Sequence, residues 1–158
     1  MELIGLIQDL YSAHRDNQTF LHARFGVSED VLMPYKKTVD RWLWPDVLRN
    51  QNTSVAKAKQ AISSYRKAVG EPAGLAELMV YFCECAAGFS NDVGYQGEGF
   101  SNALVRMFEQ ALKIALQLSP RDRDPMMIRL DRVRTVSHNL GYGVGEEMDS
   151  LLTKYIHK

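Results

Sequence analysis

The residues of this sequence that come closest to a catalytic set are an aspartate, an arginine and a histidine at helical spacing. Asp131, Arg134 and His138 stand at positions i, i+3 and i+7, so a helix would place them on one face. A carboxylate that orients a histidine is one ingredient of general base catalysis. No serine or cysteine nucleophile is tied to this face by the sequence, so we interpret it as a surface network.

A six-residue segment that occurs twice suggests a binding site. Residues 90–95 (SNDVGY) and 137–142 (SHNLGY) share Ser, Gly and Tyr at the same places, 47 positions apart. Glycine often closes a helix in the left-handed conformation, which favours Gly94 and Gly141 as two equivalent helix C-caps. If both turns fall on the same rim of the fold, they would form one polar and aromatic ligand pocket. Its lining would comprise Asn91, Asp92, Tyr95, His138, Asn139 and Tyr142.

Metal and cofactor patterns are not found in the sequence. None of the four histidines lies four residues from another, and no Glu-x-x-His motif occurs. The glycine-rich run 94–99 lacks the preceding strand and the lysine of a phosphate-binding loop. We therefore expect no metal and no cofactor. Cys83 and Cys85 would point roughly 200° apart on a helix, and we interpret them as buried thiols.

The charge of the chain is zero overall but unevenly distributed. Residues 36–67 hold eight basic side chains against two acidic ones, whereas residues 77–109 hold five acidic side chains against one arginine. This pattern indicates either two faces that attract each other, within the fold or between subunits, or a basic surface for nucleic acid at 36–67. Because a dedicated nucleic-acid-binding domain is usually basic overall, nucleic acid is the weaker of these alternatives.

Helices must position all of these groups, because strand signals are nearly absent and apolar residues recur at helical spacing. The pattern predicts about seven helices, near residues 3–14, 28–44, 55–69, 72–93, 100–118, 125–140 and 148–156. Pro34 should kink or restart its helix, and Pro125 should open the next-to-last one. The helix near 100–118 is apolar on two faces, which predicts a central position.

The fold class predicted from these elements is all-α, in one domain over residues 1–158. A content of 46% apolar and 24% charged residues is typical of a folded chain of this length. Short loops favour antiparallel neighbouring helices. The 47-residue spacing lies in the range of two-helix repeats and favours a right-handed, HEAT-like stack of helix pairs. A closed bundle stays open as the alternative.

Two tryptophans at the end of one predicted helix are candidates for an interface. Only one of the Trp42 and Trp44 indoles can face inward, so the other is either covered by a neighbouring helix or exposed to a partner. The longest apolar run, Leu78 to Cys83, is too short to span a membrane, and the N-terminus carries no secretory signature. We expect a cytoplasmic protein with no membrane partner.

Several short motifs, in this order, resemble a bacterial family of small all-helical proteins of unknown function. The motifs that carry the resemblance are the LIxxIxxLY pattern of residues 3–11, YRK at 65–67, LAEL at 75–78, VGY at 93–95, MFEQAL at 107–112 and LGYGV at 140–144. The resemblance implies an all-helical cytoplasmic domain. It carries over no catalytic or binding residues.

Because no catalytic set stands out, our leading hypothesis is a non-enzymatic helical interaction domain that binds a protein partner or associates with itself. The alternative is a small-molecule binding protein or enzyme that uses the pocket between the two Gly-Tyr turns. A second alternative is a nucleic-acid-associated protein that binds through residues 36–67.

Overall fold

The computed structural model describes residues 29–156, and this part of the chain consists of helices without strands. The elements are α2 (Glu29–Leu43), the 3₁₀ helix η1 (Val47–Arg49), α3 (Val55–Ala68), α4 (Pro72–Val93), α5 (Glu98–Ala115), α6 (Pro120–His138) and α7 (Val144–Ile156). The predicted all-α class is therefore confirmed. The helix predicted near residues 3–14 lies outside the described residues, so the count of seven stays a prediction.

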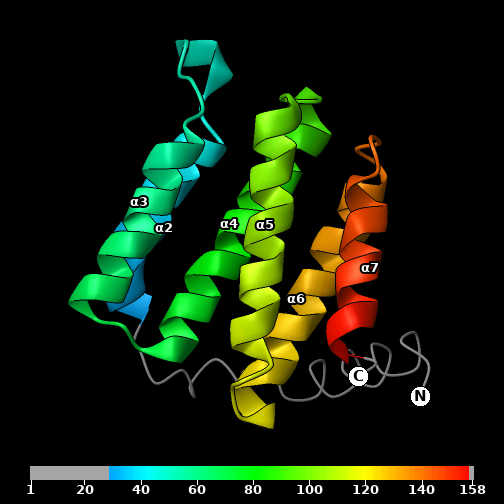
Figure 1. Ribbon diagram of the computed structural model, residues 1–158. Helices are drawn as coiled ribbons and strands as arrows, with labels where there is room; N and C mark the ends of the chain where they lie inside the picture. Colours follow the sequence, from blue (N-terminus) through cyan, green and yellow to red (C-terminus); the bar gives the residue numbers. More distant parts are fainter. Residues whose placement is uncertain (1–28, 157–158) are drawn as a thin grey trace.

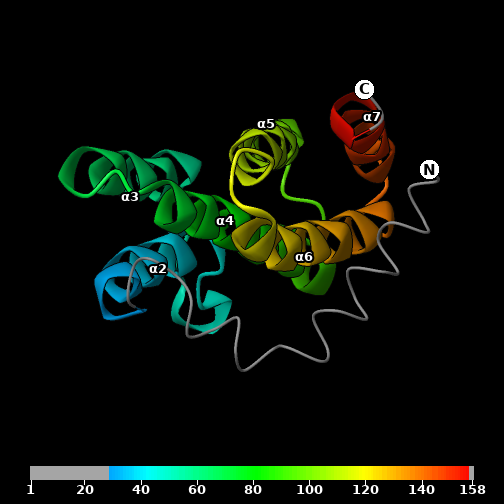
Figure 2. The same ribbon diagram turned by 90° about the horizontal axis from the view of Figure 1, so that it is seen from below.

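The six α-helices of the described part form three consecutive hairpins that lie side by side (Figure 1). Seen from below, α2, α4 and α6 make one layer, and α3, α5 and α7 make the other (Figure 2). Helix α4 packs against α2, α3, α5 and α6. The first layer therefore contains the helix that joins the three hairpins.

The central helix is α4, so the prediction that the 100–118 helix would be central is wrong. Helix α4 buries residues on all of its sides, including the fully covered Leu78 and Phe82, whereas α5 keeps a polar, exposed side. By length and composition α4 could cross a membrane, but 83% of its most apolar window is buried inside the fold. That burial is the pattern of a core helix.

The ends of α4 follow the capping signals of the sequence. Pro72 is in its first turn, and the side chain of Glu71 accepts a hydrogen bond from the Gly74 backbone nitrogen at 2.8 Å. At the other end, Gly94 (φ +118°) donates its backbone N–H to the Ser90 carbonyl at 2.9 Å. These caps fix where the loop that carries Tyr95 begins.

Two prolines lie inside helices without ending them. Pro34 is the sixth residue of α2, and Pro125 is the sixth residue of α6, which begins at Pro120. The prediction that Pro125 opens this helix is therefore wrong. So close to a helix start, a proline removes a single backbone hydrogen bond, while Pro120 in the first turn removes none.

The two cysteines are buried and free, as the sequence indicates. Burial raises the pKa of the Cys83 thiol well above its usual range. Burial, together with the nearby Asp40 carboxylate, raises the pKa of Cys85 to about 12. Both sulfurs therefore stay protonated at neutral pH and act as small apolar groups.

Candidate binding site

The rings of Tyr95 and Tyr142 stack on each other. Their centroids are 4.1 Å apart, and their planes differ by 18°. Tyr95 belongs to the loop between α4 and α5, and Tyr142 belongs to the loop between α6 and α7. Figure 1 places both loops at the same end of the helices. The two Gly-Tyr turns, 47 residues apart in the sequence, therefore meet on one rim.

The two turns are not equivalent caps, so that part of the prediction is wrong. Gly94 directly follows the last residue of α4 and caps it. Helix α6 ends at His138 with Asn139 as its cap, so Gly141 lies beyond the helix end. Because α6 ends at His138, before Gly141, the residues between α6 and α7 form a separate turn.

That separate turn holds Tyr142 in an unusual backbone conformation. Tyr142 and Gly143 have φ of +58° and +76°, and the Val144 backbone N–H donates to the Gly141 carbonyl at 3.3 Å. Two successive positive φ values at the centre of a turn are the pattern of a type I′ turn. The left-handed region costs a residue with a side chain about 1–2 kcal/mol.

Tyr142 is 75% exposed, so burial in a core does not offset this conformational cost. Tyr95 is also exposed, at 43%. Because strained backbone conformations cluster at functional sites, we take the exposed Tyr142 as a candidate recognition residue. In this conformation, the ring of Tyr142 stacks on the ring of Tyr95.

A cleft of about 320 Å³ opens beside the stacked rings, and we call it the tyrosine cleft. Its lining residues are Tyr95, Glu98, Ser101, Asn102, Val105, Tyr142, Val144 and Glu147. Glu98 stands in the first turn of α5, and Glu147 stands in the first turn of α7. A helix N-terminus offsets roughly half of one negative charge, so the cleft keeps a net negative charge.

The structure separates the six residues that the sequence assigns to one pocket. Tyr95 and Tyr142 line the tyrosine cleft, whereas Asn91, Asp92, His138 and Asn139 do not. Sequence reasoning missed the polar groups that α5 and α7 supply, above all the two glutamates. The sequence contains a pattern that indicates these two glutamates: each Gly-Tyr turn is followed within five residues by a glutamate at a helix start.

His138 stands beside an ion-pair network that joins α6 to α7. Arg134 contacts Asp131 at 2.7 Å and Asp149 at 3.1 Å, and the Nε2 atom of His138 lies 2.9 Å from Asp149. Burial alone would lower the pKa of Arg134, but the two carboxylates outweigh it and raise the pKa. Asp131, Arg134 and His138, which the sequence places on one helix face, therefore help to hold α6 against α7.

A second, more buried network joins the three helices of the first layer, and sequence reasoning missed it. Glu77 of α4 is 4% exposed and accepts hydrogen bonds from Lys36 of α2, at 2.8 Å, and from Arg129 of α6. Arg129 also binds Glu84, which lies further along α4. Two basic side chains from the outer helices thus clamp the central one.

The two candidate interface tryptophans have different environments. Trp42 packs against the core, and both the Arg41 guanidinium and the Lys57 ammonium lie 4.1 Å from its ring centroid. Trp44 remains 40% exposed and lies against Gly88, where a Cβ atom would come within 2.3 Å of the indole. The fold thus covers both indoles in part, and Trp44 keeps the larger exposed face.

Part of the basic segment 36–67 is already paired inside the fold. Lys36 forms ion pairs with Glu29 and Glu77, and Arg49 forms one with Asp46. The surface left for nucleic acid is therefore less basic than the sequence indicates. Within residues 29–156, no group of three or more His, Cys, Asp or Glu side chains is arranged to hold a metal ion.

Comparisons of the chain with protein-family models, with curated proteins and with solved structures found no match. The resemblance to a bacterial helical family therefore stays a prediction.

Proposed function

We propose that this chain is a helical interaction domain that recognises a cationic group in the tyrosine cleft. The observation that carries the proposal is the stacked pair Tyr95–Tyr142, held exposed at the edge of a negatively charged hollow. The left-handed backbone of Tyr142 forms the type I′ turn between α6 and α7, and within that turn it places the ring against Tyr95 in solvent. The proposal joins the interaction-domain hypothesis to the pocket between the Gly-Tyr turns.

The lining of the cleft favours a cation for two physical reasons. Aromatic faces attract a cation through the ring quadrupole, by about 0.5–1 kcal/mol at exposed sites and about 2 kcal/mol when water is excluded. The carboxylates of Glu98 and Glu147 add Coulombic attraction and would repel an anion. An ammonium, a methylated ammonium or a guanidinium group would fit. It could belong to a small free cation or to a basic side chain of a partner protein.

We also propose that the three hairpins are an open stack of helix pairs rather than a closed bundle. The two-layer arrangement of alternate helices supports this (Figure 2). In such a stack each pair contacts its neighbours along one direction, and the loops at one end form a continuous edge. The tyrosine cleft lies on that edge, between the second and third hairpins.

Choline and its neutral isostere 3,3-dimethyl-1-butanol provide a direct test of the cleft. We expect choline to shift the ring proton NMR resonances of Tyr95 and Tyr142, and the neutral isostere to bind about tenfold more weakly. Tyr142→Ala should weaken choline binding to a similar degree, while Tyr142→Phe should retain most of it. The measurement is a titration followed by NMR, with circular dichroism to verify that each variant is folded.

Adjacent glutamates in the first turn of α7 provide a matched control. Glu147 lines the cleft, whereas Glu146 lies 3.6 Å from His138 on another side of the helix. Glu147→Gln should weaken choline binding, and Glu146→Gln should leave it unchanged. Equal binding of choline and its isostere, or equal losses in the two variants, would exclude a cation site. A lysine-bearing peptide that displaces choline would identify a protein partner as the source of the cation.

The charged side chains of the basic and acidic segments that the fold does not already pair with each other predict association between copies. If the basic segment 36–67 of one copy meets the acidic segment 77–109 of another, the association should weaken as ionic strength rises. Light scattering coupled to size exclusion, at low and at high salt, measures this directly. A monomer at both salt concentrations would exclude self-association through these charges.

A further inference from the structure

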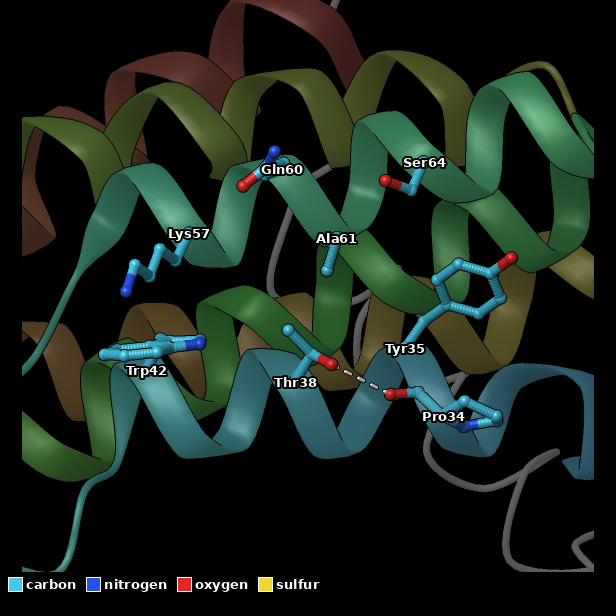
Figure 3. A pocket seen from close by; sticks show the side chains of 8 residues that line it. All are labelled: Pro34, Tyr35, Thr38, Trp42, Lys57, Gln60, Ala61 and Ser64. Carbon is cyan, nitrogen blue, oxygen red and sulfur yellow. Dashed lines mark hydrogen bonds between the residues drawn. The ribbon is translucent and has the colours of Figure 1, made fainter.

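A second hollow lies between α2 and α3, in the first hairpin and away from the tyrosine cleft (Figure 3). Its volume is about 450 Å³, within the range of small-molecule sites. We call it the tryptophan groove. Figure 3 shows Trp42 and Lys57 at one end, Ala61 in the middle, and Pro34 and Tyr35 at the other end.

One end of the tryptophan groove carries the positive charge of Lys57, which forms no ion pair with a carboxylate in the described part of the chain. The Lys57 ammonium and the Arg41 guanidinium both lie 4.1 Å from the ring centroid of Trp42. Arg41 donates one hydrogen bond to the Asn52 carbonyl at 3.2 Å, and neither cation forms an ion pair within residues 29–156. Lys57 lines the groove whereas Arg41 does not, so this end of the groove carries the charge of one lysine, which favours an anion.

The other end of the groove is apolar and fixed in shape. The ring of Tyr35 meets the buried ring of Tyr65 edge to face, with centroids 5.3 Å apart, which holds Tyr35 in place. The hydroxyl of Thr38 donates to the Pro34 carbonyl at 3.1 Å, so this donor is engaged within α2 (Figure 3). Ala61 presents a small apolar side chain to the middle of the groove (Figure 3).

We propose that the tryptophan groove binds a small organic anion with an apolar body, such as a carboxylate on a short hydrocarbon chain. The carboxylate lies at Lys57, and the hydrocarbon runs over Ala61 toward Tyr35. A stacked nucleobase fits the groove less well, because a base would have to displace a cation from the face of Trp42. This site is independent of the cation site that we propose for the tyrosine cleft.

Octanoate, octylammonium and octanol test the charge and the apolar body of the ligand separately. The chain has two tryptophans, so Trp44→Phe leaves Trp42 as the sole source of indole fluorescence. In this background we expect octanoate to shift the emission of Trp42 in a saturable way, and the other two probes to bind about tenfold more weakly or not at all. Isothermal titration of octanoate into the unmodified chain provides a second measurement that does not depend on the fluorescence background.

Two lysines on α3 provide the matched pair of variants. Lys57→Gln removes a groove cation and should weaken octanoate binding about tenfold, while Lys67→Gln, at the far end of the helix, should leave it unchanged. Equal binding of octanoate and octanol, or equal losses in the two variants, would overturn the proposal. So would a single-stranded oligothymidylate that quenches Trp42 through Lys57 while octanoate has no effect, because the groove would then belong to a nucleic-acid surface.

Discussion

Replacing Glu77 by leucine should lower the free energy of unfolding by about 3 kcal/mol. Removing one member of a buried ion pair typically costs about 3–5 kcal/mol, because the partner charge is left in a poorly solvated site. Here Glu77→Leu leaves two such partners, Lys36 and Arg129. Glu29 and Glu84 remain beside them as more exposed counterions, so the lower end of that range is expected. Urea unfolding followed by circular dichroism measures the loss.

A compensated variant distinguishes an unpaired charge from lost packing. Replacing a whole buried ion cluster by apolar side chains of similar size is often neutral or stabilising. Adding Lys36→Met and Arg129→Met to Glu77→Leu should therefore recover most of the lost stability. Arg49→Gln, which removes a solvent-exposed ion pair with Asp46, should change stability by less than about 0.5 kcal/mol. A compensated variant no more stable than Glu77→Leu would show that packing around residue 77 is the cause.

The same network sets a pH dependence with a defined sign. Burial alone would raise the pKa of Glu77, but the charges of Arg129 and Lys36 outweigh it and lower the pKa below its ordinary value of 4.5. The unfolded state therefore binds the proton first as the pH falls. The stability contributed by Glu77 is full above pH 4.5 and is lost below it, through the pKa of the folded state. Between neutral pH and about pH 3, the unmodified chain should lose stability more steeply than Glu77→Leu.

The sequence predicts the helices of this fold better than their packing. Helix α4 runs from Pro72 to Val93, as predicted, because a proline and a glycine mark its ends. The start of α6 differs from the predicted Pro125 because a proline can stand in the first turn or slightly deeper, and the sequence alone does not distinguish Pro120 from Pro125 in that role. The central helix differs from the predicted one because the sequence shows apolar residues on more than one face of both α4 and α5. It does not show which of the two helices is covered on all sides.

The candidate sites depend on distances that no local pattern contains. The recurrence of the Gly-Tyr turn is visible in the sequence, but the 4.1 Å stack of Tyr95 on Tyr142 depends on how the second hairpin packs against the third. Glu77 binds side chains 41 and 52 residues away. Two acids seven residues apart in an apolar helix, Glu77 and Glu84, are the available sign that buried partners must exist.

The charge asymmetry of the sequence corresponds to two hollows of opposite character. Lys57, from the basic segment 36–67, lines the tryptophan groove of the first hairpin. Glu98, from the acidic segment 77–109, lines the tyrosine cleft between the second and third hairpins. Helix α4 contacts both α2, which borders the tryptophan groove, and α5, which borders the tyrosine cleft.

Gly145→Ala should lower the free energy of unfolding by about 1–3 kcal/mol, because the added methyl group overpacks the contact between α6 and α7. A Cβ atom at position 145 would lie 2.7 Å from the Cα atom of His138 and 2.5 Å from its Cγ atom. A backbone atom cannot move aside like the end of a flexible side chain, so α7 has to shift. Helix α7 carries Glu147 and follows the Tyr142 turn directly, so choline binding should weaken in the same variant.

Two other glycines separate this effect from a general response to alanine. A methyl group added at Gly99, the second residue of α5, would meet no atom within 4 Å, so Gly99→Ala should leave stability unchanged or raise it by up to about 1 kcal/mol. Gly88→Ala would meet the side chain of Trp44, which is partly exposed and can rotate, so it should destabilise the fold while choline binding is retained. If Gly145→Ala behaves like Gly99→Ala, the tyrosine turn does not depend on close packing of α7 against His138.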